Sequence, residues 1–291
     1  MTKKPVRRIL PEGSLLPPTR RLLRRFGLQA RKGLGQHFLI DEEVLKRIVA
    51  SAELSAGDIV LEIGPGLGVL TRELAREAGR VVAIELDSKL AAMLKETLAS
   101  FNNVAIVNAD ILDLDPAQLI PAPTGYKVVA NLPYYIASAV LRRFLEASLK
   151  PKVMVVMVQK EVAEAIVAGP GQMSLLSVSV QFYGQPEIVD YVPAHCFYPP
   201  PEVDSAILRI DLYPQPAVAV ADEKSFFGLV RAGFTASRKQ VVNSLSQGLA
   251  LPKAEILSLL EKAGIAPQRR AETFTLEEWA QLWRVFTQEK E

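Results

Sequence analysis

From residue 59 onward, short runs rich in β-branched residues alternate with stretches of helical pattern, and this alternation limits the fold more than any other feature of the chain. Helices are expected near residues 67–78, 89–99 and 137–149, with a short one beginning at Lys160. Strands that alternate with helices are typical of a parallel sheet covered by helices on both faces. Five such strands are expected before residue 160, at Ile59–Ile63, Val81–Glu85, Val104–Asn108, Lys127–Asn131 and Val153–Val158.

The chain after residue 170 breaks this alternation. Two runs, around Ser177–Tyr183 and Asp204–Ile210, have strand composition and no long helix between them. We expect them to form an antiparallel hairpin at one edge of the sheet. The sequence therefore predicts an α/β fold that is Rossmann-like and doubly wound, with a mostly parallel seven-stranded sheet and an antiparallel edge.

Amino-acid composition and the spacing of apolar residues divide the chain into four segments. Residues 1–30 are basic and contain several prolines, which predicts a flexible N-terminal arm. Residues 31–212 carry the strand–helix alternation and form the expected cofactor-binding domain, and 213–221 have the composition of a linker. From 222 to 291 apolar residues recur at i, i+4 and i+8, which predicts a small all-helical C-terminal domain of about four short helices.

Composition also excludes several classes of protein. The chain has 49% hydrophobic and 23% charged residues, the balance of a soluble globular protein. Its longest uniformly apolar run, Val153–Val158, is too short to span a bilayer, and the N-terminus lacks the apolar segment of a secretory signal. The single cysteine, Cys196, cannot form an intramolecular disulfide, which favours the cytoplasm. With His37 and His195 as its only histidines, the chain is not expected to bind a metal.

The net charge of +2 conceals a strong asymmetry. Residues 1–36 hold ten basic side chains and one acidic side chain, a balance of +9. The rest of the chain holds 24 basic and 31 acidic side chains, a balance of −7. A basic segment on a mildly acidic body suits a polyanionic partner, most simply a nucleic acid, and it is equally compatible with a solvated leader that only maintains solubility.

A glycine-rich turn, Gly64–Gly68, follows the first expected strand, at the end where doubly wound sheets bind their ligands. The dinucleotide fingerprint needs a small residue where this chain has Val69, and no Walker Gly-Lys-Ser/Thr occurs. Pro65 also removes a backbone donor that a phosphate would use. The turn is therefore either a plain strand–helix connection or a place where a ligand without a pyrophosphate approaches the backbone.

Two carboxylates follow at the ends of the next strands. Glu85 ends the second strand, from where it can accept hydrogen bonds from both hydroxyls of a ribose. Asp110 lies just past the third strand, where it can accept from the exocyclic amine of adenine. Each acid alone is equally typical of a turn cap. Together with the glycine turn, they predict a nucleoside pocket without phosphate-binding groups, which is the description that S-adenosyl-L-methionine fits.

The fourth strand ends in Asn131-Leu132-Pro133-Tyr134, the most specific feature of the chain. An exocyclic base nitrogen is a poor nucleophile because its lone pair is delocalised into the ring. The Asn131 side-chain oxygen and the Leu132 carbonyl can accept both amine hydrogens, and Pro133 fixes the turn that presents this carbonyl. Tyr134 offers a ring face on which a base can stack. We therefore expect a catalytic turn, although the same residues also occur in plain strand–helix turns.

Six motifs of the chain resemble, in the same order, those of the ribosomal RNA adenine N6-dimethyltransferases, and specifically those of the small-subunit enzymes that modify two adjacent adenines. The similarity covers residues 30–286, including the helical tail. The erythromycin-resistance methyltransferases and the mitochondrial transcription factor relatives share the same core. The motifs are Lys32–Leu39, Leu61–Gly68, Ile84–Asp87, Asn131–Tyr134, Gln159–Val162 and Phe197–Ser205.

The resemblance implies a role for each matched position in binding S-adenosyl-L-methionine. His37 and Leu39 would close over the methionine part, and Gly64 would touch it through its backbone. Glu85 would hold the ribose, and Asp110 with the residue after it would hold the adenine. The cofactor-binding set that the resemblance implies is Gln36, His37, Leu39, Gly64, Gly66, Glu85, Leu86, Asp110, Ile111 and Asn131.

The resemblance also assigns the position of the target base. Asn131 would sit between the cofactor and the target amine. Phe197 would be the second aromatic surface, with the flipped adenine sandwiched between it and Tyr134. This chain departs from the family at Tyr135, where an Asn or another small polar residue is common, and this difference is expected to alter the rim of the pocket. The N-terminal arm is also longer than is usual in the family.

In the helical tail, Arg231, Arg238 and Lys239 would contact RNA phosphates from one helical face, the alternative being a solvated face. The expected activity is transfer of methyl groups from S-adenosyl-L-methionine to N6 of two adjacent adenines in a hairpin near the 3′ end of small-subunit (16S) rRNA, by a cytoplasmic monomer. The alternatives are a methyltransferase acting on large-subunit rRNA or DNA adenine, and a non-catalytic nucleic-acid-binding assembly or transcription factor.

Overall fold

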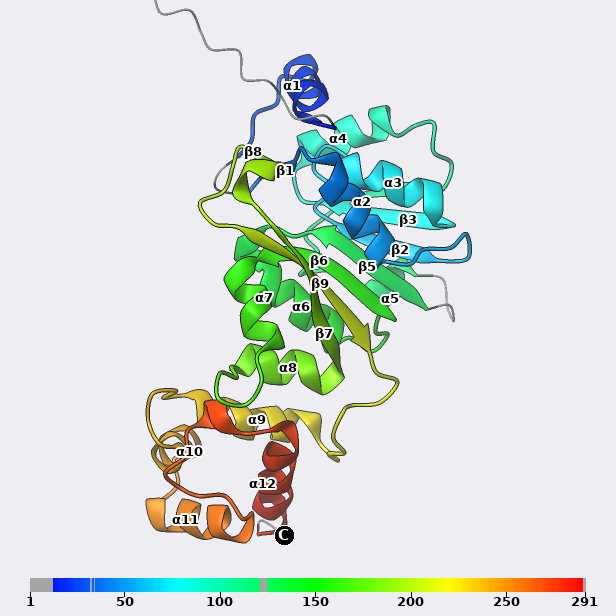
Figure 1. Ribbon diagram of the computed structural model, residues 1–291. Coiled ribbons are helices and arrows are strands. Elements are labelled where there is room, and N and C mark those ends of the chain that lie inside the picture. Colours follow the sequence, from blue (N-terminus) through cyan, green and yellow to red (C-terminus); the bar gives the residue numbers. More distant parts are fainter. Residues whose placement is uncertain (1–12, 32, 34, 121–124, 290–291) are drawn as a thin grey trace, which may run out of the picture.

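A seven-stranded sheet in the order β4-β3-β2-β5-β6-β9-β7 forms the centre of the protein (Figure 1). The computed structural model describes residues 13–31, 33, 35–120 and 125–289. Strands β2 to β6 are parallel, and β9 runs antiparallel to both β6 and β7. The predicted Rossmann-like, mostly parallel sheet with an antiparallel edge is confirmed. Its strands are β2 (Ile59–Ile63), β3 (Arg80–Glu85), β4 (Val104–Asn108), β5 (Tyr126–Asn131), β6 (Val153–Gln159), β7 (Gly184–Val192) and β9 (Ser205–Leu212).

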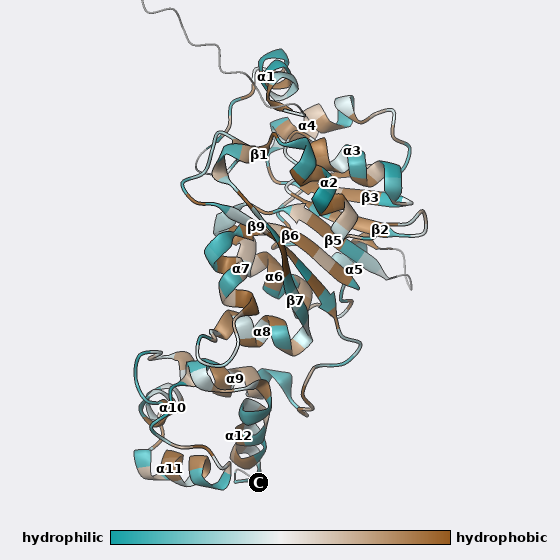
Figure 2. Ribbon diagram, viewed as in Figure 1, coloured by the Kyte–Doolittle hydropathy of each residue, from teal (hydrophilic) through white to brown (hydrophobic). Residues whose placement is uncertain are grey.

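Successive residues of the central strands face different layers of helices, which explains why these strands are apolar on both faces. Val60 and Val129 pack in the layer of α2 and α3, whereas Leu61 and Val128 pack in the layer of α6, α7 and α8. Figure 2 shows the hydrophobic residues concentrated in the sheet between these layers. The helices are α2 (Glu42–Ser51), α3 (Val69–Glu77), α4 (Ser88–Thr97) beside β3 and β4, α5 (Pro116–Leu119), α6 (Ala137–Leu145), α7 (Lys160–Val167) and α8 (Leu175–Tyr183).

The segment Ser177–Tyr183, predicted to be a strand, belongs to helix α8, and that prediction is wrong. Its alternation of Ser with apolar residues has the period of a strand, but α8 is surrounded by other elements and is buried over most of its circumference. Ser174 begins the helix by forming a capping box with Ser177. The antiparallel pair is formed by β7 and β9 instead, and Pro186 is tolerated in β7 because that strand is at the edge.

The C-terminal helices form a unit at one end of the protein (Figure 1). The segment 213–221, expected to be a linker, is held to α8 by hydrogen bonds from the backbone N–H groups of Tyr213 (2.9 Å) and Ala217 (2.8 Å). Phe182 of α8 stacks on Phe226, with ring centroids 5.1 Å apart. The helical unit therefore shares a core with α8. Its helices are α9 (Glu223–Phe234), α10 (Val241–Leu249), α11 (Lys253–Lys262) and α12 (Leu276–Gln288).

None of the helices within the described residues has the length and apolar character that crossing a bilayer requires.

The N-terminal segment contains a packed helix, α1 (Leu16–Arg25). Pro17 and Pro18 stand in its first turn, where proline is tolerated because the first N–H groups of a helix have no partner within it. Leu23 is 6% exposed and packs in a hydrophobic cluster with residues of α4. The expected flexible arm is therefore a docked helix from residue 16 onward, and residues 1–12 lie outside the described part of the chain.

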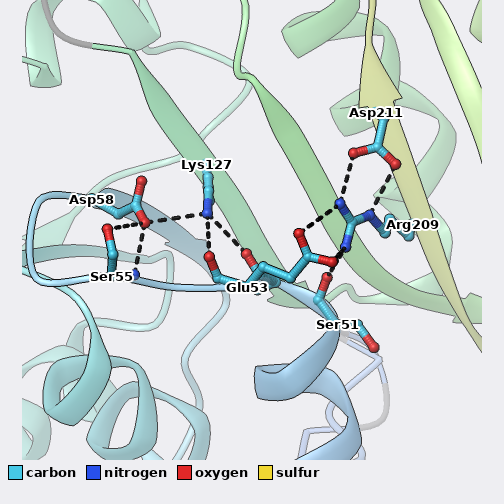
Figure 3. Close-up of polar contacts among 8 residues, drawn as sticks. Ser51, Glu53, Ser55, Asp58, Lys127, Arg209 and Asp211 are labelled. Atoms are coloured by element: carbon cyan, nitrogen blue, oxygen red, sulfur yellow. Dashed lines mark hydrogen bonds and ion pairs between the residues drawn. The ribbon is translucent and has the colours of Figure 1, made fainter.

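A network of ion pairs and hydrogen bonds joins the end of α2 to β5 and β9 (Figure 3). The Arg209 guanidinium lies 2.7 Å from Glu53 Oε1 and 2.9 Å from Asp211 Oδ1, and it donates to the carbonyl of Ser51 at 2.8 Å. Lys127 Nζ donates to the carbonyl of Glu53 at 2.7 Å. The network fixes Glu53, whose φ is +47°, in a left-handed conformation that non-glycine residues rarely adopt.

Arg209→Gln is expected to lower the free energy of unfolding by about 2 kcal/mol, because two carboxylates and a carbonyl lose a charged donor that water only partly replaces. Chemical denaturation measures the effect. Arg142→Gln is the matched control, since Arg142 of α6 forms an exposed pair with Glu146, just after that helix, and contributes less than about 0.5 kcal/mol. Equal losses in the two variants would contradict a special role for the Arg209 network.

Candidate active site

A cavity of about 270 Å³ opens at the carboxyl ends of β2, β3 and β5. Every residue predicted to bind the cofactor and every residue of the predicted catalytic turn lines it. These residues come from five separate segments of the chain: the parallel sheet brings four of them to one edge, and the fifth, with β1 of the separate β1–β8 sheet, closes over them. They are Gln36, His37, Leu39, Gly64, Gly66, Glu85, Leu86, Asp110, Ile111, Asn131, Leu132, Pro133 and Tyr134.

The glycine turn approaches the cavity with its backbone. Gly64, Gly66 and Gly68 have φ values of +65°, +57° and +73°, a region that side chains disfavour. A Cβ on Gly66 would lie 3.2 Å from the ring of Phe38, so the close approach needs glycine for space as well as for conformation. The turn thus leaves room for a ligand against the main chain.

Glu85 and Asp110 lie side by side at the ends of β3 and β4. The Glu85 carboxylate accepts from the backbone N–H of Gly66 at 3.1 Å and from that of Asp87 at 2.9 Å, and burial raises its pKa. Each of its oxygens keeps capacity for a second hydrogen bond. Asp110 Oδ1 accepts from the N–H of Leu112 at 2.9 Å, so this residue does cap its turn while it lines the cavity.

The catalytic turn begins where β5 ends. The N–H of Leu132 donates to the carbonyl of Met157 at 3.1 Å, which ties the turn to β6. Asn131 Nδ2 donates to the carbonyl of His37 at 3.2 Å, and this bond orients the amide so that its oxygen is left to accept from a ligand. A contact between residues 94 positions apart in the sequence therefore fixes the direction in which the Asn131 side-chain oxygen points.

Tyr134 is held at both of its ends. Its hydroxyl bonds Ser205 Oγ at 2.7 Å, and its ring stacks on that of His37 with centroids 5.8 Å apart. His37 Nδ1 donates to the carbonyl of Pro199 at 2.8 Å, because a carbonyl can only accept. Burial raises the pKa of Tyr134, which keeps the phenol uncharged. Ser205 and Pro199 were not predicted as site residues, and both act here as supports of the predicted ones.

Phe197, the predicted second aromatic surface, does not line the cavity. It pairs with Leu39 in a two-stranded sheet of β1 (Phe38–Leu39) and β8 (Phe197–Tyr198), and its side chain is 2% exposed in the core near α2. The structure therefore does not bring Phe197 and Tyr134 to opposite sides of the cavity. Tyr135, in contrast, does line the cavity, and its Cδ1 would lie 3.3 Å from a Cβ on Gly35.

The three residues predicted to contact RNA are all exposed, but they do not share a helix face. Arg231 belongs to α9, whereas Arg238 and Lys239 lie in the turn between α9 and α10. The prediction of a single helical face is therefore wrong. The helix ends at Phe234, and Ser244 Oγ holds the turn by donating to the carbonyl of Ala236 at 2.9 Å.

Glu62 is a site residue that the sequence analysis missed. It is the next-to-last residue of buried strand β2, is 1% exposed and lines the cavity. Its Oε2 has no hydrogen-bond partner among the described residues. Burial, with a contribution from the negative charge of Glu85, raises the pKa of Glu62 to about 8. An ionisable side chain in an otherwise apolar strand was the signal that could have identified it.

Glu62→Gln is expected to stabilise the ligand-free protein at alkaline pH. The folded protein holds the Glu62 proton more tightly than the unfolded chain, so stability falls as pH rises from the unfolded pKa to about 8. The neutral amide removes this loss, and its advantage should be larger at pH 8.5 than at pH 5 by at least about 2 kcal/mol. Denaturation at both pH values measures it. The exposed α3 variant Glu77→Gln is the control, and a pH-independent effect of Glu62→Gln would contradict the assignment.

The donors and acceptors of the cavity fit S-adenosyl-L-methionine. Glu85 retains acceptor capacity for two hydroxyls, and the turn at Gly64 and Gly66 admits a ligand against its backbone. Glu62 Oε2, which is buried without a hydrogen-bond partner among the described residues, suits a cationic group, and this cofactor carries both an ammonium and a sulfonium. The roles of individual residues in holding it remain predictions.

The strand order, the nucleoside-sized cavity and the Asn-Leu-Pro-Tyr turn at its edge define a Rossmann-like methyltransferase of the class that modifies base nitrogens. The family profile described as ribosomal RNA adenine dimethylase matches residues 27–288. The chain belongs to the ribosomal RNA adenine dimethylase family.

Individual relatives agree with this assignment. The chain is 52% identical over 276 residues to the ribosomal RNA small subunit methyltransferase A of Dehalococcoides mccartyi, covering 94% of each chain. It is 45% identical to the protein of that name from Moorella thermoacetica, covering 90% of this chain and 94% of the relative. The crystal structure of the 23S rRNA methyltransferase ErmE has a TM-score of 0.68 at 32% identity, covering 86% of this chain and 99% of that one. A dimethyladenosine transferase from Plasmodium falciparum has a TM-score of 0.73 at 25% identity, covering 87% and 98%.

Proposed function

We propose that the protein transfers methyl groups to N6 of two adjacent adenines in a hairpin near the 3′ end of small-subunit (16S) rRNA, giving N6,N6-dimethyladenosines. The observation that carries this proposal is the Asn131–Tyr134 turn, held rigidly beside a cavity whose acceptors suit a nucleoside cofactor. The 52% identity to a small-subunit rRNA methyltransferase over nearly the whole chain favours this RNA over the alternatives.

S-adenosyl-L-methionine, when bound, supplies an electrophilic methyl group on a cationic sulfur. Glu85 would accept from its ribose hydroxyls, Asp110 from its adenine amine, and Gly64 would contact its methionine part through the backbone. Glu62 would face a positive charge, which favours the ionised carboxylate over the protonated form that burial favours in its absence.

On the substrate side, Asn131 Oδ1 and the Leu132 carbonyl accept the two hydrogens of the adenine amine and localise its lone pair. Tyr134 supplies a stacking face for a base taken out of its helix. The hydrogen bond from Asn131 to His37 and that between Tyr134 and Ser205 fix both groups in advance, so that little reorganisation is needed at the moment of transfer. No side chain has to act as a strong base, because the nitrogen becomes acidic once it carries an additional methyl group.

The proposal includes a monomeric enzyme that acts in the cytoplasm. Arg231, Arg238 and Lys239 would position structured RNA through phosphate contacts. The proposed stacking face is Tyr134, since the Phe197 side chain is buried and does not line the cavity.

The test is to incubate the protein and labelled S-adenosyl-L-methionine with unmethylated small subunits, free large-subunit rRNA and DNA, and to map the labelled nucleosides. We expect dimethyladenosine in small-subunit rRNA at two adjacent positions. Label only in large-subunit rRNA or DNA would overturn the substrate assignment. No transfer to any of them, with RNA binding intact, would favour a binding factor that keeps the fold without its chemistry.

A further inference from the structure

Helix α1 is strongly amphipathic. Its inner face packs on the body of the protein: Thr19 and Leu23 are buried, and Leu22 and Phe26 are partly buried against the same cluster. Its outer face presents four exposed arginines within one and a half turns, two pairs at i, i+4 spacing: Arg20, Arg21, Arg24 and Arg25. We call these four side chains the α1 arginine face.

Helix α1 packs next to the cavity. Leu23 packs in one cluster with Phe38 and Leu67, both of which also line the cavity. The Arg20 guanidinium lies 5.0 Å over the ring of Tyr198. Tyr198 pairs in the β1–β8 sheet with Phe38, which lines the cavity. Arg20 therefore lies against the β1–β8 sheet, whose strand β1 lines the cavity.

These charges are only partly compensated within the protein. Arg25 pairs with Glu96 at 2.6 Å, but both side chains are more than half exposed, so the pair is weak. For Arg21 and Arg24, the structure shows no ion pair among the described residues. Four neighbouring like charges repel one another, and the docking of the inner face holds them together. Such an arrangement is stabilised when an anionic partner binds.

We propose that the α1 arginine face is a phosphate-binding surface for the RNA strand that flanks the target adenine; this rests on the proposed function. Arginine binds phosphate in a bidentate geometry, and a rigid helix positions the side chains before binding, which lowers the entropic cost. In Figure 1, α1 and the C-terminal helices lie at opposite ends of the molecule. An RNA held at both ends would have its target adenine fixed between two sets of phosphate contacts.

The test compares Arg21→Gln/Arg24→Gln with the wild-type protein in binding to unmethylated small-subunit RNA. We expect RNA affinity to fall about 10-fold and the slope of log K against log salt to decrease by about 1.5, as for the loss of two phosphate contacts. The affinity for S-adenosyl-L-methionine should be unchanged. The matched control is Arg76→Gln/Arg142→Gln, which removes two exposed arginines that pair locally within α3 and α6.

An unchanged affinity and salt slope in the α1 variant would overturn the proposal, and so would an equal loss in the control, which would indicate a purely global charge effect. Because binding is measured directly, this result is independent of methyl transfer. If the protein methylated none of the nucleic acids tested, the proposed function would fail while the salt slope would still decide whether α1 contacts RNA.

Discussion

Asn131→Ala is expected to reduce methyl transfer at least about 100-fold at saturating cofactor, while RNA binding changes less than about threefold. The side chain offers the acceptor that localises the lone pair of the amine, and the hydrogen bond to the His37 carbonyl aims it in advance. Its removal acts in the transition state rather than in the bound complex. Single-turnover rates with saturating RNA and cofactor measure the loss directly.

Two comparisons separate this role from a structural one. Asn131→Asp keeps an acceptor but loses the donor to His37, so it should lose less activity than Asn131→Ala. Asn103→Ala removes an amide that only donates to the backbone carbonyls of Ala75 and Ala78, so it should affect stability and leave the rate of the folded enzyme close to normal. A rate for Asn131→Ala within threefold of wild type would refute the assigned role.

The central sheet could be predicted because its strands are buried on both faces and read as short apolar runs separated by helical periods. The error at Ser177–Tyr183 has a physical cause. In a helix buried on nearly all sides, the amphipathic period disappears, and local alternation of Ser and Val then resembles a strand. The prolines of the N-terminal segment lead to the opposite error, a helix that is missed. Pro17 and Pro18 predict an interruption of helical structure, but they lie in the first turn of α1, where proline is tolerated.

In the cavity, residues at strand ends could be predicted because parallel strands bring their carboxyl ends to one edge. The hydrogen-bond partners that hold these side chains in place could not be predicted. Tyr134 meets Ser205 across 71 residues and His37 meets Pro199 across 162, and no local pattern specifies such pairs. The same holds for Phe197, whose burial follows from its pairing with Leu39.

The second large effect is expected at Glu85. Glu85→Ala should raise the dissociation constant of S-adenosyl-L-methionine about 100-fold, the equivalent of two hydrogen bonds to a charged acceptor. The demethylated product should lose affinity equally, because both ligands carry the same ribose. This equal loss distinguishes Glu85 from Asn131, whose substitution affects the rate.

Glu85→Gln should be nearly as harmful as Glu85→Ala, because an amide nitrogen cannot accept from the backbone N–H of Gly66 or Asp87 and one of these donors loses its partner.

Burial raises the pKa of Glu85, and the ionised form is the one that accepts from both hydroxyls. Wild-type affinity should therefore fall as pH is lowered toward that raised pKa, and Glu85→Gln should lose this part of the pH dependence. Calorimetry at several pH values measures both effects, with Glu77→Gln as the exposed control. Affinity within threefold of wild type in Glu85→Ala would show that the cofactor is held elsewhere.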